Sequence, residues 1–362
     1  MRIAFYSPIA KPSDTTPSGT ARVGALLVQA LRAGGNTVDL PPLPRSYEGK
    51  GDAARQAQIF SECENAATNY LEAIALGTEP RPDLWFSYHV YYKSPDWIGP
   101  HVAKSLGIPY IVAEGSHAPK RANGPWSLGH EGTTKALQAA DRLLAMTSFD
   151  RVCLEWIAKN RVRDLKPFID ATSFLFSQHL ASEPPKLLAA AMMRNERKLA
   201  SYRLLALALS KIERPVTLQI VGDGIHRPEI ERAFAPLTQH QITFLGALPR
   251  EKLPDIMASS DLFTWPGLGE AYGLVFLEAQ AAGLPVVACR DRGVPDVVRA
   301  PGSAWLSPPG DPDAYARNIE LLLKDEELRR GASIIAHQFV RFERSTPFAA
   351  STLNNILGEL RP

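Results

Sequence analysis

Two glutamates in the second half of the chain have the spacing and surroundings to bind a nucleotide attached to a sugar. Glu270 follows the apolar run 262–265, and Glu278 lies in an apolar helical pattern that opens at Gly273. The first N–H groups of a helix lack partners and carry a partial positive charge, which suits a diphosphate. A carboxylate only accepts hydrogen bonds, so Glu278 can take both hydroxyls of a ribose, and Glu270 can reach hydroxyls of a sugar beyond the diphosphate.

The alternative is that both glutamates are ordinary surface charges. Two glutamates eight positions apart are weak evidence for a site. Glu278, however, lies between the apolar run 274–277 and the small, mostly apolar run 279–283. An unpartnered carboxylate inside such a helix is costly, so its surroundings favour a functional role.

The elements that would position these residues recur along the chain. Short apolar strands alternate with helical patterns, which is typical of βαβ units and a parallel sheet. Strands are expected at 2–6, 36–40, 83–88, 108–113, 142–146, 187–192, 217–221, 242–245, 262–265 and 286–288. Helices are expected at 20–33, 52–77, 97–106, 131–140, 148–159, 198–211, 228–235, 250–259, 273–282, 293–299, 311–324 and 325–342. We therefore predict two doubly wound α/β domains in tandem, with ligands at the carboxyl ends of the strands.

Length and composition exclude several classes of protein. The 362 residues suffice for two domains, at roughly 150 residues per domain. Hydrophobic residues make up 45% and charged residues 22%, as in a globular chain rather than a disordered one. The net charge of +2 argues against a domain that binds nucleic acid. The strand at 2–6 is followed by a proline-rich stretch rather than by G-x-G-x-x-G, so nicotinamide or flavin chemistry is not expected.

Cysteine usage and hydropathy bear on the compartment. Cys63, Cys153 and Cys289 are far apart and fit neither a metal site nor a disulfide framework. We see no signal-peptide pattern and no transmembrane helix, so we expect a cytoplasmic protein. One basic cluster is either a solvated face or a peripheral contact with the inner face of an anionic membrane. It consists of Lys159, Arg161, Arg163 and Lys166.

The segment 261–288 resembles the retaining glycosyltransferases of family 4, in the GT-B superfamily. These proteins carry an E-x7-E motif of the form E-x-F/Y-G-L-x-x-L-E-A-x-A-x-G-x-P-V-V-A. The chain reads Glu270-Ala271-Tyr272-Gly273-Leu274, then Leu277-Glu278-Ala279, then Gly283 and Pro285-Val286-Val287-Ala288. The resemblance implies that Glu270 takes part in catalysis. It also implies donor binding by Ala271, Tyr272, Gly273, Leu274 and Glu278.

Further landmarks of this family follow in order. After the strand at 187–192, Arg194 and Lys198 match the cations that grip the donor diphosphate, although many members place the lysine further along. The alternative for this pair is an ordinary surface pair at positions i and i+4. Gly222 lies in the family's glycine turn, and Leu245 in its F-L-G stretch, both on the donor side.

The first domain carries weaker matches. Gly19 and Thr20 stand where the family has a glycine loop near the donor, with one glycine where many members have two. His117 follows a strand at the place of the family's active-site histidine, and we expect it to be catalytic. His89, which also ends a strand, is the second candidate, and a structural role stays open for each.

Residues near these histidines suggest an acceptor site. Aromatic faces stack on sugar rings, and a basic loop can hold a phosphate or a lipid headgroup. Ordinary loop packing explains the same residues equally well. The acceptor-side candidates are His89, Tyr91, Lys120 and Trp126.

The resemblance implies the GT-B fold, in which two Rossmann-like doubly wound parallel-sheet domains face each other across a cleft. We expect an acceptor-side domain at 1–170, a linker at 171–185 and a nucleotide-sugar-binding domain at 186–342. Residues 343–362 are expected to form a C-terminal helix that packs back on the first domain.

The function implied is transfer of a sugar, with retention, from a UDP- or GDP-sugar to a hydroxyl of a glycan, lipid-linked or small-molecule acceptor, as in polysaccharide biosynthesis. The resemblance implies no cofactor and no metal. Two alternatives stay open: a nucleotide-sugar epimerase or hydrolase on the same fold, and a non-catalytic nucleotide-sugar-binding partner subunit.

Overall fold

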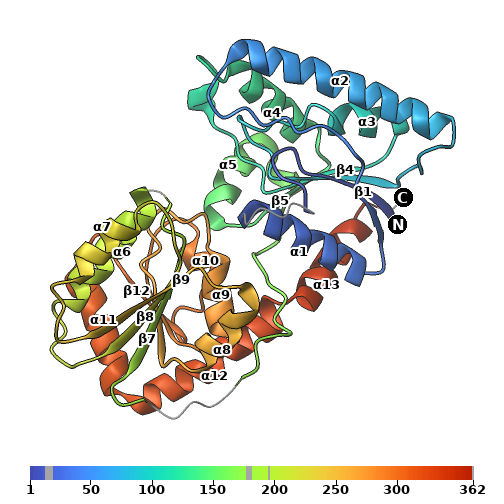
Figure 1. Ribbon diagram of the computed structural model, residues 1–362. Helices are drawn as coiled ribbons and strands as arrows, with labels where there is room; N and C mark the ends of the chain where they lie inside the picture. Colours follow the sequence, from blue (N-terminus) through green and yellow to red (C-terminus); the bar gives the residue numbers. More distant parts are fainter. Residues whose placement is uncertain (13–18, 177–181, 195, 361–362) are drawn as a thin grey trace. The chain divides into compact units, whose positions relative to one another are not determined.

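The structure, a computed structural model, describes residues 1–12, 19–176, 182–194 and 196–360 (Figure 1). Contacts within the chain divide it into two units. The first unit comprises Met1–Lys166 together with Thr346–Pro362, and the second comprises Pro167–Ser345. Each unit is built on one parallel sheet, as predicted from the alternation of strands and helices.

The first sheet has six parallel strands in the order β2-β1-β3-β4-β5-β6. They are β1 (Arg2–Tyr6), β2 (Thr37–Asp39), β3 (Leu84–Tyr88), β4 (Tyr110–Ala113), β5 (Arg142–Ala145) and β6 (Val162–Asp164). Every residue of β3 and β4 is buried. A parallel strand that is covered on both faces reads as an apolar run rather than an alternation, which explains the pattern in the sequence.

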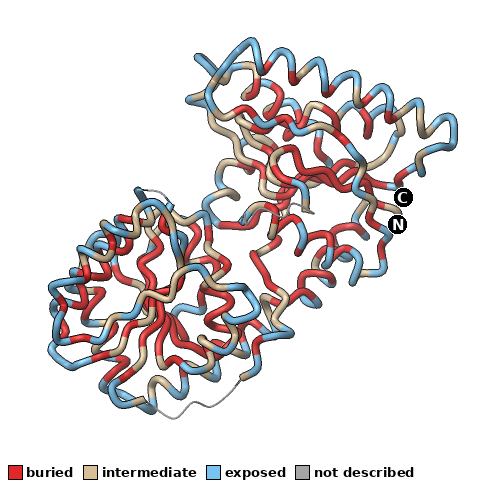
Figure 2. The backbone as a smooth tube through the Cα atoms, in the orientation of Figure 1, coloured by how far each residue is buried: buried red, intermediate tan, exposed pale blue. Residues whose placement is uncertain are grey.

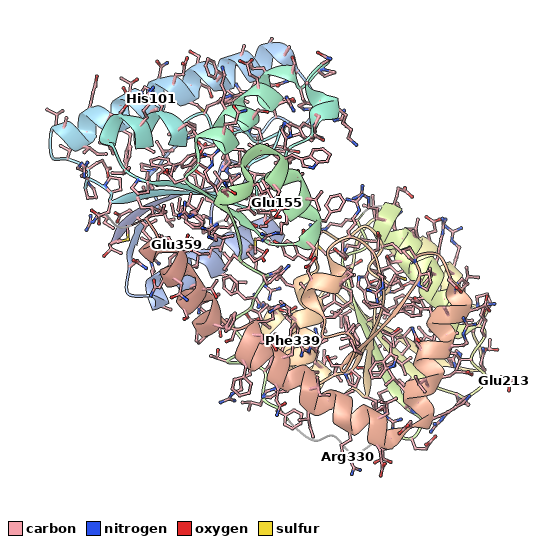
Figure 3. The ribbon with its side chains drawn as sticks, turned by 180° about the vertical axis from the view of Figure 1, so that it is seen from behind. His101, Glu155, Glu213, Arg330, Phe339 and Glu359 are labelled. Carbon is pink, nitrogen blue, oxygen red and sulfur yellow. The ribbon has the colours of Figure 1, made fainter. Side chains whose placement is uncertain are left out.

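Helices cover this first sheet. They are α1 (Gly19–Ala33), α2 (Ala53–Ala75), α3 (Gly99–Leu106), α4 (Ser127–Ala139), α5 (Ser148–Ala158) and α13 (Thr346–Gly358), with short 3-10 turns η1 (Pro119–Arg121) and η2 (Lys159–Arg161). The last helix packs on α1, where Asn354 Nδ2 donates to the Gly34 carbonyl at 2.9 Å. Glu359, labelled in Figure 3, pairs with Arg142 at 3.0 Å and with Arg163 at 2.8 Å.

The second sheet also has six parallel strands, in the order β12-β11-β10-β7-β8-β9. They are β7 (Lys186–Ala190), β8 (Thr217–Val221), β9 (Gln241–Gly246), β10 (Leu262–Thr264), β11 (Val286–Cys289) and β12 (Ala304–Ser307). The helices are α6 (Glu196–Leu209), α7 (Arg227–Phe234), α8 (Leu253–Ala258), α9 (Leu274–Ala281), α10 (Val294–Val297), α11 (Pro312–Lys324) and α12 (Glu326–Glu343), with the 3-10 turn η3 (Arg250–Lys252). Figure 2 shows buried residues along the strands of both sheets.

The strand order locates one special edge in each sheet. In the second sheet the chain builds β7, β8 and β9 outward in one direction, then returns to place β10 on the other side of β7. In the first sheet the order reverses between β1 and β3. Ligands of doubly wound sheets bind beyond the carboxyl ends of the strands at such a switch point. The loops after β7 and β10 are therefore the place to examine in the second unit.

Most predicted elements are present, with bounds that shift by a few residues. Two edge strands, β6 and β12, were not predicted, and the helix predicted at 250–259 is η3 followed by the shorter α8. Part of the predicted linker, 177–181, lies outside the described residues. Asp261, just before β10, accepts from the backbone N–H groups of Ser182 at 3.2 Å and of Lys186 at 2.7 Å.

Candidate active site

Lys198 and Glu270 meet at the switch point of the second sheet. Lys198 lies in the first turn of α6, which follows β7, and Glu270 lies in the loop after β10. Lys198 Nζ pairs with Glu270 Oε1, and Trp265 Nε1 donates to the same oxygen at 3.3 Å. The Lys198 and Glu270 side chains are only 18% and 15% exposed. The structure thus brings together two of the predicted catalytic residues, which are 72 positions apart in the sequence.

The loop that carries Glu270 is fixed by its glycines and by neighbouring loops. Gly269 has φ +70° and donates its N–H to Asp291 Oδ2 at 2.6 Å. A Cβ at this position would lie 2.4 Å from Cδ of Arg197, so glycine is required both for the backbone angle and for the close approach. Asp291 follows β11, and Arg197 lies in α6, which follows β7. Residues that follow β7 and β11 therefore hold the loop that follows β10.

Arg197 lies near this loop, whereas Arg194 lies beside the turn at Gly224. The guanidinium of Arg197 is directed at the Gly269 carbonyl, with Nη1 at 3.5 Å from the oxygen. Arg194 is exposed, and its Cγ packs beside the turn at Gly224. Arg197 was missed from the sequence, although it stands directly before Lys198 and so is as close to the strand end as the predicted cations.

Glu278 is buried, as its sequence surroundings predicted. It lies in α9 and is 2% exposed, and Arg250 Nη2 is 3.1 Å from its Oε1. Arg250 lies in η3 after β9 and is itself 44% exposed. This partner was not identified from the sequence. The available signal was a cation just beyond the carboxyl end of the strand predicted at 242–245.

The helix behind Glu270 begins where the sequence predicted. Gly273 caps α9 with φ +77°, in the left-handed region that favours glycine. Leu274 and Tyr272 are buried, whereas Ala271 is exposed in the loop. The first N–H groups of α9 therefore follow the Glu270 loop directly, which places an anion-binding helix end beside Glu270 and Lys198.

The turn after β8 completes the carboxyl edge of the second sheet. Gly222 has φ +141°, and a Cβ there would lie 1.9 Å from the Ala191 carbonyl oxygen. Its N–H donates to the carbonyl of Gly246 at 2.8 Å, which ties the turn to the end of β9. Leu245 is half-buried in β9. The turn after β8 and the end of β9 are thus joined through their backbones at the carboxyl edge of the sheet.

In the first unit, His89 pairs with Glu114. Both residues end strands of the first sheet and have positive φ, of 64° and 55°. His89 Nδ1 is 3.4 Å from Glu114 Oε1. Burial disfavours the charged form of His89, but the charge and hydrogen bond of Glu114 outweigh it and raise the pKa of His89. His89 is therefore more readily protonated than a free histidine.

His117 lies against His130 rather than against His89. The centroids of the His117 and His130 rings are 5.1 Å apart. Burial lowers the pKa of His117, and the neighbouring His130 lowers it further. The two histidine candidates thus have opposite character: His89 favours the charged form, and His117 favours the neutral form.

An aromatic row extends from His89. The ring of His89 contacts Tyr91 at 5.2 Å, Tyr91 contacts Tyr92 at 5.5 Å, and Tyr92 contacts Trp126 at 5.6 Å, all between centroids and edge to face. The cations over the Trp126 indole are Lys93, at 4.8 Å, and Arg121, at 5.0 Å. Lys120 is exposed in η1. The structure thus joins Tyr91 and Trp126 into one surface and places Lys93 and Arg121 over its indole.

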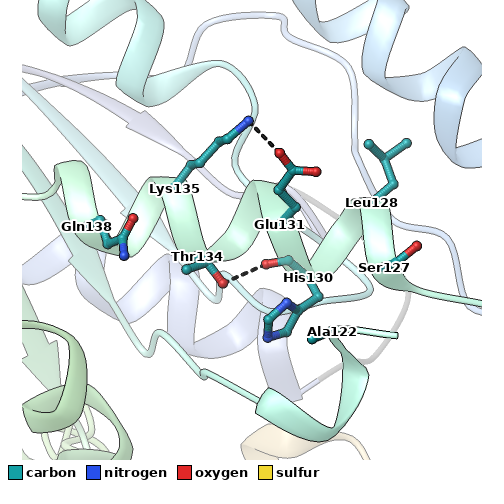
Figure 4. A pocket seen from close by; sticks show the side chains of 8 residues that line it. All are labelled: Ala122, Ser127, Leu128, His130, Glu131, Thr134, Lys135 and Gln138. Carbon is teal, nitrogen blue, oxygen red and sulfur yellow. Dashed lines mark hydrogen bonds and ion pairs between the residues drawn. The ribbon is translucent and has the colours of Figure 1, made fainter. Parts of the chain in front are cut away.

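A pocket of about 600 Å³ runs along α4 beside this surface (Figure 4). Its lining residues are Ala122, Ser127, Leu128, His130, Glu131, Thr134, Lys135 and Gln138. Figure 4 shows the ion pair between Lys135 and Glu131, which is 2.7 Å long. His130 belongs both to this pocket and to the histidine pair, so the pocket lies next to His117.

The start of α1 holds the remaining predicted donor residues. Gly19 is exposed and Thr20 is half-buried in the first turn of α1. The preceding residues, 13–18, which include most of the predicted glycine loop, lie outside the described residues. A Cβ at Gly19 would meet no atom within 4 Å among the described residues, so close packing does not require glycine there.

Comparison with known proteins identifies the second unit. Residues 184–325 match the family model described as glycosyl transferases group 1. We call residues 184–325 the group 1 segment. The group 1 segment contains Arg194, Lys198, Glu270 and Glu278, so the family match covers the four predicted residues at the switch point.

One curated relative extends beyond the group 1 segment. The sulfoquinovosyl transferase SQD2 of Arabidopsis thaliana is 29% identical over 247 residues, or 63% of this chain. The chain spans about half, 48%, of that relative's length.

Two solved structures match over the whole chain. Sucrose-phosphate synthase from Thermosynechococcus elongatus has a TM-score of 0.75 at 19% identity, with 99% of this chain and 98% of that chain covered. HepE of Anabaena, solved in complex with UDP-glucose, has a TM-score of 0.68 at 15% identity, with 99% and 100% covered. The chain has the predicted GT-B class of fold, with two doubly wound parallel-sheet units.

The described residues also bear on the predictions about metal binding and membrane contact. Within them, no group of three or more histidine, cysteine, aspartate or glutamate side chains is placed to hold a metal ion. None of the described helices is long and apolar enough to span a membrane. The basic cluster is largely engaged in the fold: Arg161 donates to the carbonyls of Gln138 and Ala140, and Arg163 pairs with Glu359.

Burial changes the pKa of the Lys198 side-chain amine. Burial lowers the pKa of Lys198 to about 8, although the Glu270 carboxylate acts in the opposite direction. An amine that binds phosphate as a cation loses this role as the pH rises through its pKa. The same amine is fully charged below that pH.

We therefore expect kcat/KM for the donor to fall as the pH rises above about 8, which is the pKa of Lys198 in the free protein. In the pH profile of kcat, the corresponding fall (the basic limb) should lie at higher pH, because a bound diphosphate favours the ammonium form of Lys198. Steady-state kinetics from pH 6 to 10 in one ionic strength measure both limbs. Lys198→Arg is the control, since arginine stays charged and should remove the limb. An unchanged limb in that variant would assign the titration to another group.

Proposed function

We propose that the chain is a retaining glycosyltransferase that moves a sugar from a UDP- or GDP-sugar to a hydroxyl group. The observation that carries the proposal is the cluster of Lys198, Glu270 and Glu278 around the N-terminus of α9, inside the group 1 segment. A cation, a helix end and two acceptor-only carboxylates offer one partner for each part of a nucleotide sugar: the diphosphate, the sugar hydroxyls and the ribose.

The donor is proposed to lie along the carboxyl edge of the second sheet. Glu278 accepts from the ribose hydroxyls, and the N–H groups of α9, together with the backbone from Ala271 to Leu274, surround the diphosphate. Gly222 and Leu245 border the nucleoside. Gly19 and Thr20 remain proposed donor-binding residues of the first unit. Support for a uridine nucleotide comes from HepE, whose structure contains UDP-glucose.

The proposed chemistry rests on charge stabilisation at the leaving group. As the bond between the sugar and the diphosphate breaks, negative charge grows on the leaving oxygen, and Lys198 with Arg194 stabilises it. Arg197, which is directed at the Gly269 carbonyl, is the alternative second cation. The acceptor hydroxyl attacks from the same face, and its proton passes to the departing phosphate. No protein nucleophile and no metal ion are proposed.

The acceptor is proposed to bind on the first unit. Tyr91 and Trp126 belong to the aromatic row that can stack on a sugar ring, and the nearby cations can meet an anionic group. Lys120 is proposed to contact the acceptor from the exposed turn η1. His117, neutral at physiological pH, and His89 are the two candidates for contact with the transferred sugar.

A panel of nucleotide sugars tests this proposal. A true donor present at 100 times its dissociation constant should add about 2.7 kcal/mol to the free energy of unfolding. Thermal shift identifies the base and sugar, and NMR of the product with a panel of acceptors reports the anomeric configuration. Turnover should persist in a chelator. Binding without transfer to any acceptor would indicate the non-catalytic alternative, and inversion or a metal requirement would contradict the proposed mechanism.

A further inference from the structure

Trp265 contacts both charged residues of the candidate site. It follows β10 directly, and its side chain is fully buried. Its indole N–H donates to Glu270 Oε1 at 3.3 Å, and Lys198 Nζ lies 5.6 Å from its ring centroid. Tyr202 of α6 fixes the other side of the indole, with ring centroids 4.7 Å apart and an interplanar angle of 62°.

We propose that Trp265 is a positioning residue that holds Lys198 and Glu270 in the geometry needed for transfer. The proposal rests on the proposed function and assigns no direct contact between Trp265 and the substrate. It concerns a residue outside the predicted donor and catalytic sets.

The need for such a residue follows from the charges. Lys198 and Glu270 are paired in the unliganded protein, whereas the proposed donor requires them to act on different groups. An arriving diphosphate takes Lys198, so the Glu270 carboxylate loses its cationic partner. The indole N–H remains as a donor to that carboxylate and keeps one oxygen in place, while the other oxygen accepts from a sugar hydroxyl. A catalytic group that is misplaced by 1 Å can cost about 10²-fold in rate.

The surroundings of Lys198 explain why the indole also affects its charge. The ring face attracts the ammonium group, and the bulk of the indole excludes water from it. Several charged or titratable groups lie near Lys198 or pack against its partners. They are Glu270 and Asp291 from the loops after β10 and β11, and Arg197 and Tyr202 from α6.

A double-mutant cycle with Trp265→Phe and Glu270→Gln tests the proposal through kcat. Phenylalanine keeps an aromatic ring but has no N–H to donate. Trp265→Phe should lower kcat by about 10- to 100-fold, with the dissociation constant of the nucleoside diphosphate nearly unchanged. In the Glu270→Gln background most of this loss should disappear, because the partner of the indole has already been altered. An equal loss in both backgrounds would show that Trp265 acts on the fold alone.

A second readout needs no donor and no turnover. The pKa of Lys198 can be followed by NMR after isotopic labelling of its side-chain amine. In Trp265→Phe, water reaches the ammonium group, and Glu270, without the indole N–H, pairs with Lys198 alone. Both changes favour the charged form, so the pKa should rise. An unchanged or lower pKa would overturn the proposal, even if the wild-type protein transfers no sugar and the proposed function fails.

Trp85→Phe is a matched control. Trp85 lies in β3 of the first unit, is fully buried, and donates its indole N–H to Ser87 Oγ at 3.0 Å. The variant removes the same atoms from a core and should lower stability without changing the pKa of Lys198. Should Trp265→Phe fail to fold, Trp265→Tyr fills more of the space, also lacks the indole N–H, and serves in the same measurements.

Discussion

Replacing Lys198 by alanine is expected to lower kcat by about 10²–10³, the usual cost of removing one preorganised donor from a developing negative charge. The affinity for the nucleoside diphosphate should change much less. The diphosphate is already charged when it binds, but its leaving oxygen gains charge as the glycosidic bond breaks, and an interaction that grows in that step raises turnover. Steady-state kinetics with a saturating acceptor, and calorimetry with the diphosphate, separate the two effects.

Two comparisons sharpen this test. Lys211→Ala removes a lysine of the same unit that pairs with Asp313 at 2.8 Å, and should leave kcat unchanged. Arg194→Ala and Arg197→Ala, measured side by side, decide which guanidinium is the second cation. If Lys198→Ala instead raises KM and leaves kcat intact, Lys198 stabilises the bound donor and the transition state equally. The catalytic assignment of Lys198 would then be wrong.

Glu278→Ala is expected to weaken binding of the nucleoside diphosphate tenfold to 150-fold, because hydrogen bonds to a charged group contribute about 1.5–3 kcal/mol. Glu278 is proposed to contact only the ribose, so the contacts that other residues make with the base and the diphosphate should remain. Glu278→Gln keeps the size of the side chain and replaces one acceptor oxygen by a donor, so it should also be impaired. Isothermal titration measures all three proteins.

The ribose assignment has its own control in the ligand. The wild-type protein should bind the ribonucleoside diphosphate more tightly than its 2′,3′-dideoxy form. Glu278→Ala should lose this preference, since the group that recognises the hydroxyls is gone. A folded variant that still discriminates between the two ligands would show that another residue contacts the ribose. Arg250, paired with Glu278 at 3.1 Å, would be the first to examine.

The sequence predicted the central strands of both sheets and two of the four edge strands, β2 and β9. β1 and β8 have their predicted bounds, and each is a mostly apolar run with a strand neighbour on both sides. β6 has three residues, two of them charged, and β12 lies between proline-containing turns. Both are edge strands with one strand neighbour, and both are short, with three residues in β6 and four in β12.

The candidate site was predictable in its members and not in its pairings. Glu270 and Glu278 could be identified from residue type and surroundings, and Lys198 from the family resemblance. The contacts of Arg250 with Glu278 and of Arg197 with Gly269 could not, because they join segments that only the strand order of the second sheet brings together. Strand order brings β7 beside β10, and nothing local in either segment specifies that neighbour.

The position of α13 has a consequence for biosynthesis. The helix belongs to the first unit and packs on α1, but it is encoded after the whole second unit. The second unit is thus an insertion into the first, and a ribosome must complete it before the covering helix of α1 exists. During that interval the face of α1 that α13 will cover remains open to chaperones. The first unit can therefore be completed only after residues 167–345 have been synthesised.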